Sequence, residues 1–122
     1  MMKMCLIVDD SEVVRRVAKA IVEELGFVTL EAENGEQALQ QCRSDMPDVI
    51  ILDWHMPKKD GVSFLEELAQ LEDGDLPRVI FTPMEHDAPL INRAIAAGAN
   101  DYLLKPYDLH HVREKLSAAG LV

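Results

Sequence analysis

The sequence predicts an α/β sandwich, in which a parallel sheet carries helices on both faces. Short continuous apolar runs alternate five times with longer stretches whose apolar residues recur at helical spacing. Such short runs are typical of strands buried on both faces, as in parallel sheets. No internal repeat, linker or low-complexity tract interrupts the alternation, so each helix is expected to return the chain to a new parallel strand.

The apolar runs place the strands. Four of them, at 4–8, 49–52, 79–81 and 102–104, are continuous enough for inner strands. The segment 27–32 mixes polar and apolar residues, which is typical of an edge strand. The 122 residues suit one domain, expected to span 1–122 with no output domain, unless the chain is excised from a longer protein.

The first helix is predicted between Ser11, a suitable N-cap, and Gly26, a suitable C-terminal stop. Its buried face is expected to consist of Val13, Val14, Val17, Ala18, Ile21, Val22 and Leu25. The opposite, solvated face would carry Arg15, Arg16, Lys19 and Glu23. A second helix is expected from Asn34 to about Arg43, and a third that carries Phe64, Leu65, Leu68 and Leu71. A fourth is expected after Asp87, with Ile95 on its apolar face, and stops at Gly98; the last begins after Asp108.

Composition excludes several classes of protein. The chain has 22 acidic and 12 basic residues, a net charge of -10, and a nucleic-acid backbone would repel such a surface. The apolar start is too short, and too soon acidic, for a signal peptide, and no run is long enough to span a membrane, so the cytoplasm is the expected compartment. Cys5 and Cys42 lie in no metal or redox motif and are expected to be buried thiols.

Polar residues follow the predicted strands where each strand ends. Asp9 and Asp10 follow the first, Asp53 the third, Thr82 the fourth and Lys105 the fifth. Ligands of open parallel sheets bind beyond the carboxyl ends of the strands, so these five side chains are expected to converge. Taken alone, an acidic pair at a strand end is more often a solvated turn or a helix cap; the shared placement is what predicts a site.

This constellation suits metal-assisted phosphoryl chemistry. Crowded carboxylates hold a proton more readily than usual or bind a cation, and hard oxygen ligands suit Mg²⁺. Asp53 could then attack a phosphoryl donor in line and form an acyl phosphate. Lys105 could hold one phosphoryl oxygen by charge, and the hydroxyl of Thr82 could donate to another.

The segments LIVDDSEVVR, VIILDWHMPKKDG, VIFTP and GANDYLLKP resemble, in order and spacing, the signature blocks of response-regulator receiver domains of two-component signalling. The likeness is to stand-alone, chemotaxis-regulator-like members and covers essentially all of the chain. It implies a flavodoxin-like (βα)5 three-layer sandwich whose five parallel strands have the order 2-1-3-4-5.

The resemblance also assigns roles at the metal site. It implies that Asp53 is the phosphoacceptor and that Asp10, Asp53 and the backbone carbonyl of His55 contact Mg²⁺ directly. Asp9 would act mainly through water. Met56, Pro57 and Gly61 match the loop that follows the acceptor, where the glycine would permit a positive φ.

A second group of implied roles concerns the response to phosphorylation. Thr82 and Tyr102 would be the switch pair, although Tyr102 could equally be a plain core aromatic. Lys105 would hold the phosphoryl group, and the Lys105–Pro106 peptide would be cis, which aims the ammonium group into the pocket.

The implied function is a phosphorylation-controlled interaction switch or a phosphorelay intermediate. Its partners would be a histidine kinase or a histidine phosphotransfer protein, and an unknown target on the face of the fourth helix, fifth strand and fifth helix, around Tyr102, Tyr107 and His111. No contact with nucleic acid or membrane is expected. The only catalysis expected is Mg²⁺-dependent self-phosphorylation and slow auto-dephosphorylation.

Three positions depart from the family pattern. Pro83 stands where the family usually has a small residue whose N–H donates to a phosphoryl oxygen, and proline has no N–H. Three interpretations stay open: Pro83 weakens the phosphorylated state, a water or a shifted backbone replaces the missing donor, or Pro83 merely shapes the loop. His55 and Met84 occupy positions that tune acyl-phosphate hydrolysis, and their net effect does not follow from sequence; His86, His110 and His111 are expected at the surface.

Two rival functions stay open. A degenerate pseudo-receiver would bind partners without phosphorylation. A metal-dependent phosphohydrolase or nucleotide enzyme is the other, but such phosphohydrolases normally carry a second aspartate two residues after the nucleophile, where this chain has His55, and there is no GxxxxGK loop.

Overall fold

The computed structural model describes residues 2–54, 59–71 and 76–122. In this part of the chain five strands pair in parallel in the order β2-β1-β3-β4-β5, as predicted. They are β1 (Met4–Val8), β2 (Val28–Ala32), β3 (Val49–Asp53), β4 (Arg78–Thr82) and β5 (Asp101–Tyr102). Edge strand β2 is only partly buried, whereas every residue of β3 is buried.

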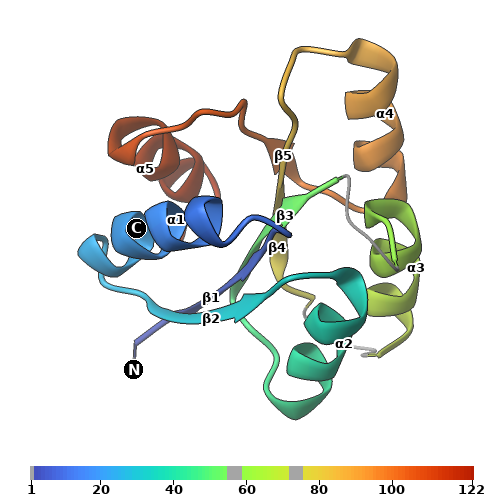
Figure 1. Cartoon of the computed structure of the whole chain (residues 1–122), viewed down its shortest axis with the longest axis horizontal. Coiled ribbons are helices and arrows are strands. Elements are labelled where there is room, and N and C mark those ends of the chain that lie inside the picture. Colours follow the sequence, from blue (N-terminus) through green and yellow to red (C-terminus); the bar gives the residue numbers. More distant parts are fainter. Residues whose placement is uncertain (1, 55–58, 72–75) are drawn as a thin grey trace.

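The helices form two outer layers around the sheet (Figure 1). One layer contains α1 (Glu12–Glu24) and α5 (Leu109–Ala118); the other contains α2 (Gly35–Ser44), α3 (Gly61–Leu71) and α4 (Ala88–Ala97). Side chains of β1 alternate between the two layers, since Leu6 and Val8 belong to the core under α2–α4 and Cys5 and Ile7 to the core under α1 and α5. The three-layer sandwich is therefore confirmed.

The predicted starts of α1, α2, α4 and α5 are confirmed, because the N-cap of each makes its expected bond. Side chains of Ser11, Asn34, Asp87 and Asp108 each accept a backbone N–H three residues later, which satisfies a donor that the helix itself leaves free. Gly98 ends α4 with a φ of 126°, a conformation that glycine adopts without a steric penalty. The Lys105–Pro106 peptide is cis, as predicted.

Two predictions about the buried helix faces are wrong in part. Val13 and Val17 of α1 are 69% and 50% exposed, and Ile95 of α4 is exposed as well. The predicted apolar stripe of α1 is wider than the arc that reaches the sheet, and only its Ala18 and Val22 side is fully buried. Conversely, the side chain of Arg15, predicted to be solvated, is only 14% exposed.

The fifth strand differs from its prediction at both ends. β5 comprises Asp101 and Tyr102 rather than 102–104. Beyond Tyr102 the backbone still follows β4, because the N–H of Leu103 donates to Phe81 and that of Lys105 donates to Pro83, each at 2.9 Å. Those bonds deliver Lys105 to the edge of the sheet where the other predicted site residues lie.

Candidate functional site

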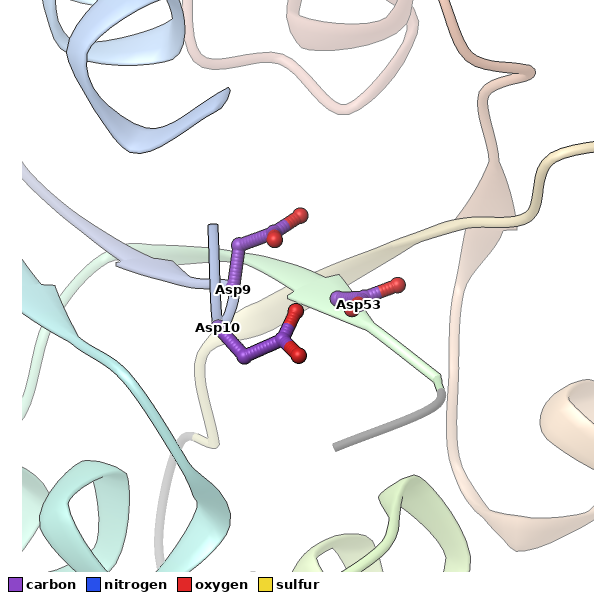
Figure 2. Close-up of side chains that lie close together, drawn as sticks. All are labelled: Asp9, Asp10 and Asp53. Atoms are coloured by element: carbon purple, nitrogen blue, oxygen red, sulfur yellow. The ribbon is translucent and has the colours of Figure 1, made fainter. Parts of the chain in front are cut away.

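Three carboxylates gather beyond the carboxyl ends of β1 and β3. Asp9 and Asp10 follow β1, Asp53 is the last residue of β3, and one oxygen of each lies within 4.8 Å of the others. Figure 2 shows the three carboxylates grouped at this edge, with Asp10 reaching toward Asp53. The arrangement can hold a metal ion, since clustered carboxylate oxygens are the ligands of hard divalent cations.

Lys105 completes the cluster from the other side. Its Nζ donates to Asp9 Oδ2 at 2.6 Å and to Asp53 Oδ1 at 3.1 Å. The ammonium group therefore joins two of the three acids, which are far apart along the chain.

Asp9 and Asp10 differ in whether their carboxylate oxygens accept hydrogen bonds from the protein. Asp9 is buried, and its second carboxylate oxygen accepts the N–H of Ser11 at 2.9 Å, so both oxygens have partners. Asp10 is exposed, and its carboxylate makes no hydrogen bond with any residue that the structure describes. Of the two, Asp10 is the one that is free to bind a cation directly.

Asp53 is buried in the floor of the site. Its Oδ1 accepts both the Lys105 ammonium and, at 3.0 Å, the N–H of Trp54. Burial raises the pKa of Asp53, the charge of Lys105 opposes that shift, and the nearby acids Asp9 and Asp10 reinforce it. A raised pKa agrees with the prediction that crowded acids retain a proton, although burial contributes more than repulsion.

Lys105 remains a cation in this setting. Burial lowers the pKa of Lys105, but its hydrogen bond to Asp9 and the charges of Asp53 and Asp9 outweigh burial and leave that pKa raised. The site therefore contains a positive charge beside the Asp53 carboxylate.

Thr82 lies next to Asp53 on the neighbouring strand. The two residues are register partners of β3 and β4, and the Thr82 side chain is buried. Its hydroxyl donates to the carbonyl of Leu52 at 3.3 Å, a long bond that another acceptor in the site could replace.

The hollow above these residues has a volume of about 510 Å³. Besides the three acids, Thr82 and Lys105, its wall is formed by one serine, two further acids and apolar side chains: Ser11, Glu85, Asp87, Val14, Trp54, Pro83, Met84 and Leu90. A hollow of this volume can admit a phosphoryl group together with part of its donor.

The role predicted for Gly61 needs correction. This residue has no positive φ; instead a Cβ at position 61 would lie 2.5 Å from the ring of Trp54. That ring is buried and packs edge-to-face on Phe81, with centroids 5.1 Å apart. Glycine is needed here because the start of α3 passes directly over the indole, a tertiary contact without a sequence signal.

Tyr102 lies at a junction of three elements. The ring of His86 meets it edge-on, with centroids 5.8 Å apart, and the Lys115 ammonium lies 5.2 Å from its centroid. Lys115 is also paired with Asp101 at 3.0 Å. The ring is partly buried against the core, so both expectations for Tyr102, core aromatic and switch, are compatible with its position.

The remaining candidates are distributed as follows. His86, His110 and His111 are exposed, as predicted, and Cys5 and Cys42 are buried free thiols. Pro83 is buried and Met84 is exposed at the rim. The predicted metal-binding carbonyl of His55, with Met56 and Pro57, lies outside the described residues.

Sequence reasoning missed one residue at this site. Arg15 was assigned to the solvated side of α1, but its guanidinium donates to the backbone carbonyl of Asp9 at 2.7 Å. Its position one turn after Ser11, on the flank of the predicted apolar stripe, was the only available signal.

Among the described helices, none is long and apolar enough to cross a membrane.

Comparison with known proteins identifies the family. The response regulator receiver domain profile matches residues 5–117. The chain is 35% identical over 113 residues to the chemotaxis protein CheY of Bacillus subtilis, covering 92% of each, and 32% identical over 117 residues to the CheY of Halobacterium salinarum, covering 96% of each.

Solved structures agree with this assignment. A putative response regulator from Chloroflexus aurantiacus superposes with a TM-score of 0.90 at 27% identity over 97% of each chain. The receiver domain of a sensor histidine kinase from Pseudomonas aeruginosa, solved with a magnesium ion coordinated in its active-site cleft, gives a TM-score of 0.87 at 26% identity over 97% of each chain. Receiver domains are in general non-enzymatic signalling modules that interact with histidine kinases or phosphotransfer proteins. This chain belongs to the response regulator receiver domain family of two-component systems.

Proposed function

We propose that Asp53 accepts a phosphoryl group from the phosphohistidine of a histidine kinase or phosphotransfer protein, in a reaction that depends on Mg²⁺. The phosphorylated chain then switches its protein contacts or passes the phosphoryl group on. One observation carries the proposal: Lys105 bridges Asp9 and Asp53, while Asp10 beside them has a carboxylate that bonds to none of the residues at 2–54, 59–71 and 76–122.

The donor set fits Mg²⁺. Asp10 and Asp53 would hold the ion directly, together with the backbone carbonyl of His55 that the family resemblance implies, and Asp9 would act through water because both its oxygens are engaged. Mg²⁺ keeps several waters and needs few protein ligands, so two carboxylates and a carbonyl suffice. When bound, it would offset negative charge on the donor's phosphoryl oxygens.

The hydrogen bonds of Asp53 select its nucleophilic atom. Oδ1 accepts from both Lys105 and Trp54, whereas Oδ2 accepts no hydrogen bond from the described part of the chain and so has lone pairs available to phosphorus. A bond from Oδ2 to phosphorus forms as the phosphorus–nitrogen bond of phosphohistidine breaks, and the imidazole leaves with that electron pair. No oxidant or second substrate is needed for this transfer.

Arrival of the phosphoryl group would redirect two side chains. The Lys105 ammonium can exchange its contact with Asp53 for a phosphoryl oxygen, and the Thr82 hydroxyl can exchange the Leu52 carbonyl for another. Such interactions exist only after phosphorylation, which is what a change in conformational population requires. The affected surface would be that of α4, β5 and α5, around Tyr102, Tyr107 and His111.

Further parts of the proposal concern setting and partners. The net charge of -10 supports a role without direct nucleic-acid contact. We place the chain in the cytoplasm, where kinases form phosphohistidine from ATP, and we treat 1–122 as one functional domain. Its own chemistry would be limited to accepting the phosphoryl group and slowly hydrolysing the acyl phosphate.

A pseudo-receiver is the second candidate, favoured by the missing N–H at Pro83. Incubation with acetyl phosphate and Mg²⁺, followed by intact-mass analysis, separates the two functions. The wild-type chain should gain one phosphoryl group, Asp53→Asn should gain none, and the exposed control Asp45→Asn should gain one as well. No mass gain with acetyl phosphate, phosphoramidate or a phosphorylated phosphotransfer protein would favour the pseudo-receiver.

A further inference from the structure

Arg15 connects three elements below the acidic cluster. It lies in the first turns of α1, where its Nη1 donates to the main-chain oxygen of Asp9 at 2.7 Å. Its Nε donates to Glu31 of β2 at 3.2 Å, and the side chain is only 14% exposed. One guanidinium therefore ties the β1–α1 turn to both the helix that follows it and the edge strand.

This bond completes the fixation of Asp9. The Asp9 N–H donates to the Ala32 carbonyl at 3.1 Å, and the two carboxylate oxygens accept from Ser11 and Lys105. With Arg15 on the carbonyl, every polar group of Asp9 has a partner. That completeness matters because Asp9 is where the chain leaves the sheet.

The carbonyl held by Arg15 belongs to the peptide unit that joins Asp9 to Asp10. Since a peptide unit is planar, fixing its oxygen fixes the direction in which the chain enters Asp10. Asp10 itself is exposed, and its carboxylate has no protein partner among the described residues, so its direction depends on this backbone anchor.

We propose that Arg15 is a positioning residue for Asp10, and through it for the Mg²⁺ site. The inference rests on the proposed function, because it assumes that Asp10 binds the ion. Glu31 has a supporting part: its carboxylate orients the guanidinium and offsets a positive charge that would otherwise oppose binding of a cation.

A plain surface ion pair would not have this effect. Exposed ion pairs contribute little to stability, and Arg16 supplies the comparison within the same helix. Arg16 pairs with Glu12 at 2.9 Å, but its side chain is 76% exposed and bonds to no backbone group of the residues that the structure covers. Arg16→Gln therefore serves as the matched control for Arg15→Gln.

The test is the Mg²⁺ affinity of the unphosphorylated protein, measured from Trp54 fluorescence and by calorimetry. Loss of an outer-shell partner typically weakens metal binding by about 10-fold or more, and that is the change expected for Arg15→Gln, with Arg16→Gln within about twofold of wild type. Arg15→Lys should recover part of the loss, since one ammonium can reach the Asp9 carbonyl or Glu31 but lacks the fork that joins both.

A second readout needs no metal. In Mg²⁺-free protein the backbone amide signals of Asp10 and Ser11 should shift in Arg15→Gln and stay in place in Arg16→Gln. If Arg15→Gln does not fold, Glu31→Gln tests the proposal instead. A loss of Mg²⁺ affinity of about threefold or more, as expected for one weakened hydrogen bond, supports the positioning role. An unchanged Mg²⁺ affinity overturns it.

Asp10→Asn separates the possible failures. If Asp10→Asn abolishes Mg²⁺ binding while Arg15→Gln binds as tightly as wild type with unmoved amide signals, the positioning role is wrong and the proposed function stands. If Asp10→Asn binds Mg²⁺ unchanged, the metal site itself is misassigned, and the inference about Arg15 is overturned with it.

Discussion

The ammonium group of Lys105 lies closer to Asp9, at 2.6 Å, than to Asp53, at 3.1 Å. In the unphosphorylated protein the stronger hydrogen bond of Lys105 is therefore made to the acid that is not the proposed acceptor. Asp9 holds the ammonium group at the edge of the site, from which it can move its second contact to an arriving phosphoryl oxygen without leaving Asp9.

Removing this cation should cost stability in the absence of Mg²⁺. Lys105→Met leaves the buried carboxylates of Asp9 and Asp53 without their shared partner, and loss of one charged hydrogen-bond partner typically costs about 1.5–3 kcal/mol. Urea unfolding with a chelator present measures the free energy of unfolding. Saturating Mg²⁺ should restore part of the loss, because the ion replaces the missing positive charge.

The control for this variant is Lys19→Met. Lys19 is only partly buried and forms no ion pair with any residue that the structure describes, so its substitution should change the free energy of unfolding little. A Lys105→Met protein as stable as wild type in chelator would mean that the site is more open to water than its burial indicates.

The raised pKa of Asp53 predicts how stability depends on pH. The folded protein holds the Asp53 proton more tightly than the unfolded chain does, chiefly because the carboxyl is buried. The protonated Asp53 carboxyl therefore contributes to stability in full at a pH below its pKa in the unfolded chain. This contribution is lost as the pH rises through its pKa in the folded protein. Without Mg²⁺, Asp53→Asn should be more stable than wild type near neutral pH, with the gap closing as the pH falls.

Unfolding by urea across a pH series, in chelator, checks this expectation. The exposed Asp45→Asn is the matched control and should follow wild type throughout. A less stable Asp53→Asn near neutral pH would contradict the raised pKa of Asp53. It would mean that the attraction of Lys105 for the Asp53 carboxylate outweighs burial and the repulsion of Asp9 and Asp10.

The strand ends explain why so much of this site could be predicted. Apolar runs define where buried strands stop, and parallel strands bring their carboxyl ends to one edge, so the convergence of Asp9, Asp53 and Lys105 follows from chain order alone. Helix starts were equally predictable, because an N-cap such as Asn34 makes a local bond within three residues.

Contacts that depend on tertiary packing were not predictable. The apolar pattern of α1 admits several rotations of the helix, and only the packed structure shows that Val13 faces out and Arg15 faces Glu31. Likewise, nothing near Gly61 in sequence indicates that the ring of Trp54 lies over it. The functional roles of the site residues stay predictions, which the experiments proposed for them address.

The contact between Gly61 and Trp54 predicts a packing defect with an optical signal. In Gly61→Ala the new methyl group would lie 2.5 Å from the indole, so the ring or the start of α3 must shift. Overpacking of this kind typically costs about 1–3 kcal/mol. The emission of Trp54, the one tryptophan in the chain, should change in the folded protein.

Thermal unfolding and fluorescence spectra measure the two effects together. Ser63→Ala, an exposed position in the same helix, is the control and should alter neither strongly. An unchanged emission spectrum with unchanged stability would show that α3 can move away from the indole at no cost.

We predict that the phosphoryl group on this chain is bound less tightly than it would be if position 83 had a backbone N–H. Its carbonyl accepts the N–H of Lys105 at 2.9 Å, which keeps the residue beside the site, but it has no N–H of its own to offer a phosphoryl oxygen. Pro83→Ala restores that donor. A charge-assisted bond contributes about 1.5–3 kcal/mol, so the affinity for beryllofluoride should rise by roughly 10-fold or more, and the acyl phosphate should persist longer.

Pro89→Ala is the matched control, since Pro89 is an exposed proline in the first turn of α4 and does not line the hollow. Beryllofluoride affinity is measured by titration of Trp54 fluorescence, and the acyl-phosphate lifetime by loss of the added mass over time. If Pro83→Ala and Pro89→Ala both match wild type in these two measurements, Pro83 only shapes the loop. An N–H at position 83 that changes neither the affinity nor the lifetime makes no hydrogen bond to the phosphoryl group. Lys105 and Thr82 would then hold the phosphoryl group without help from the backbone at position 83.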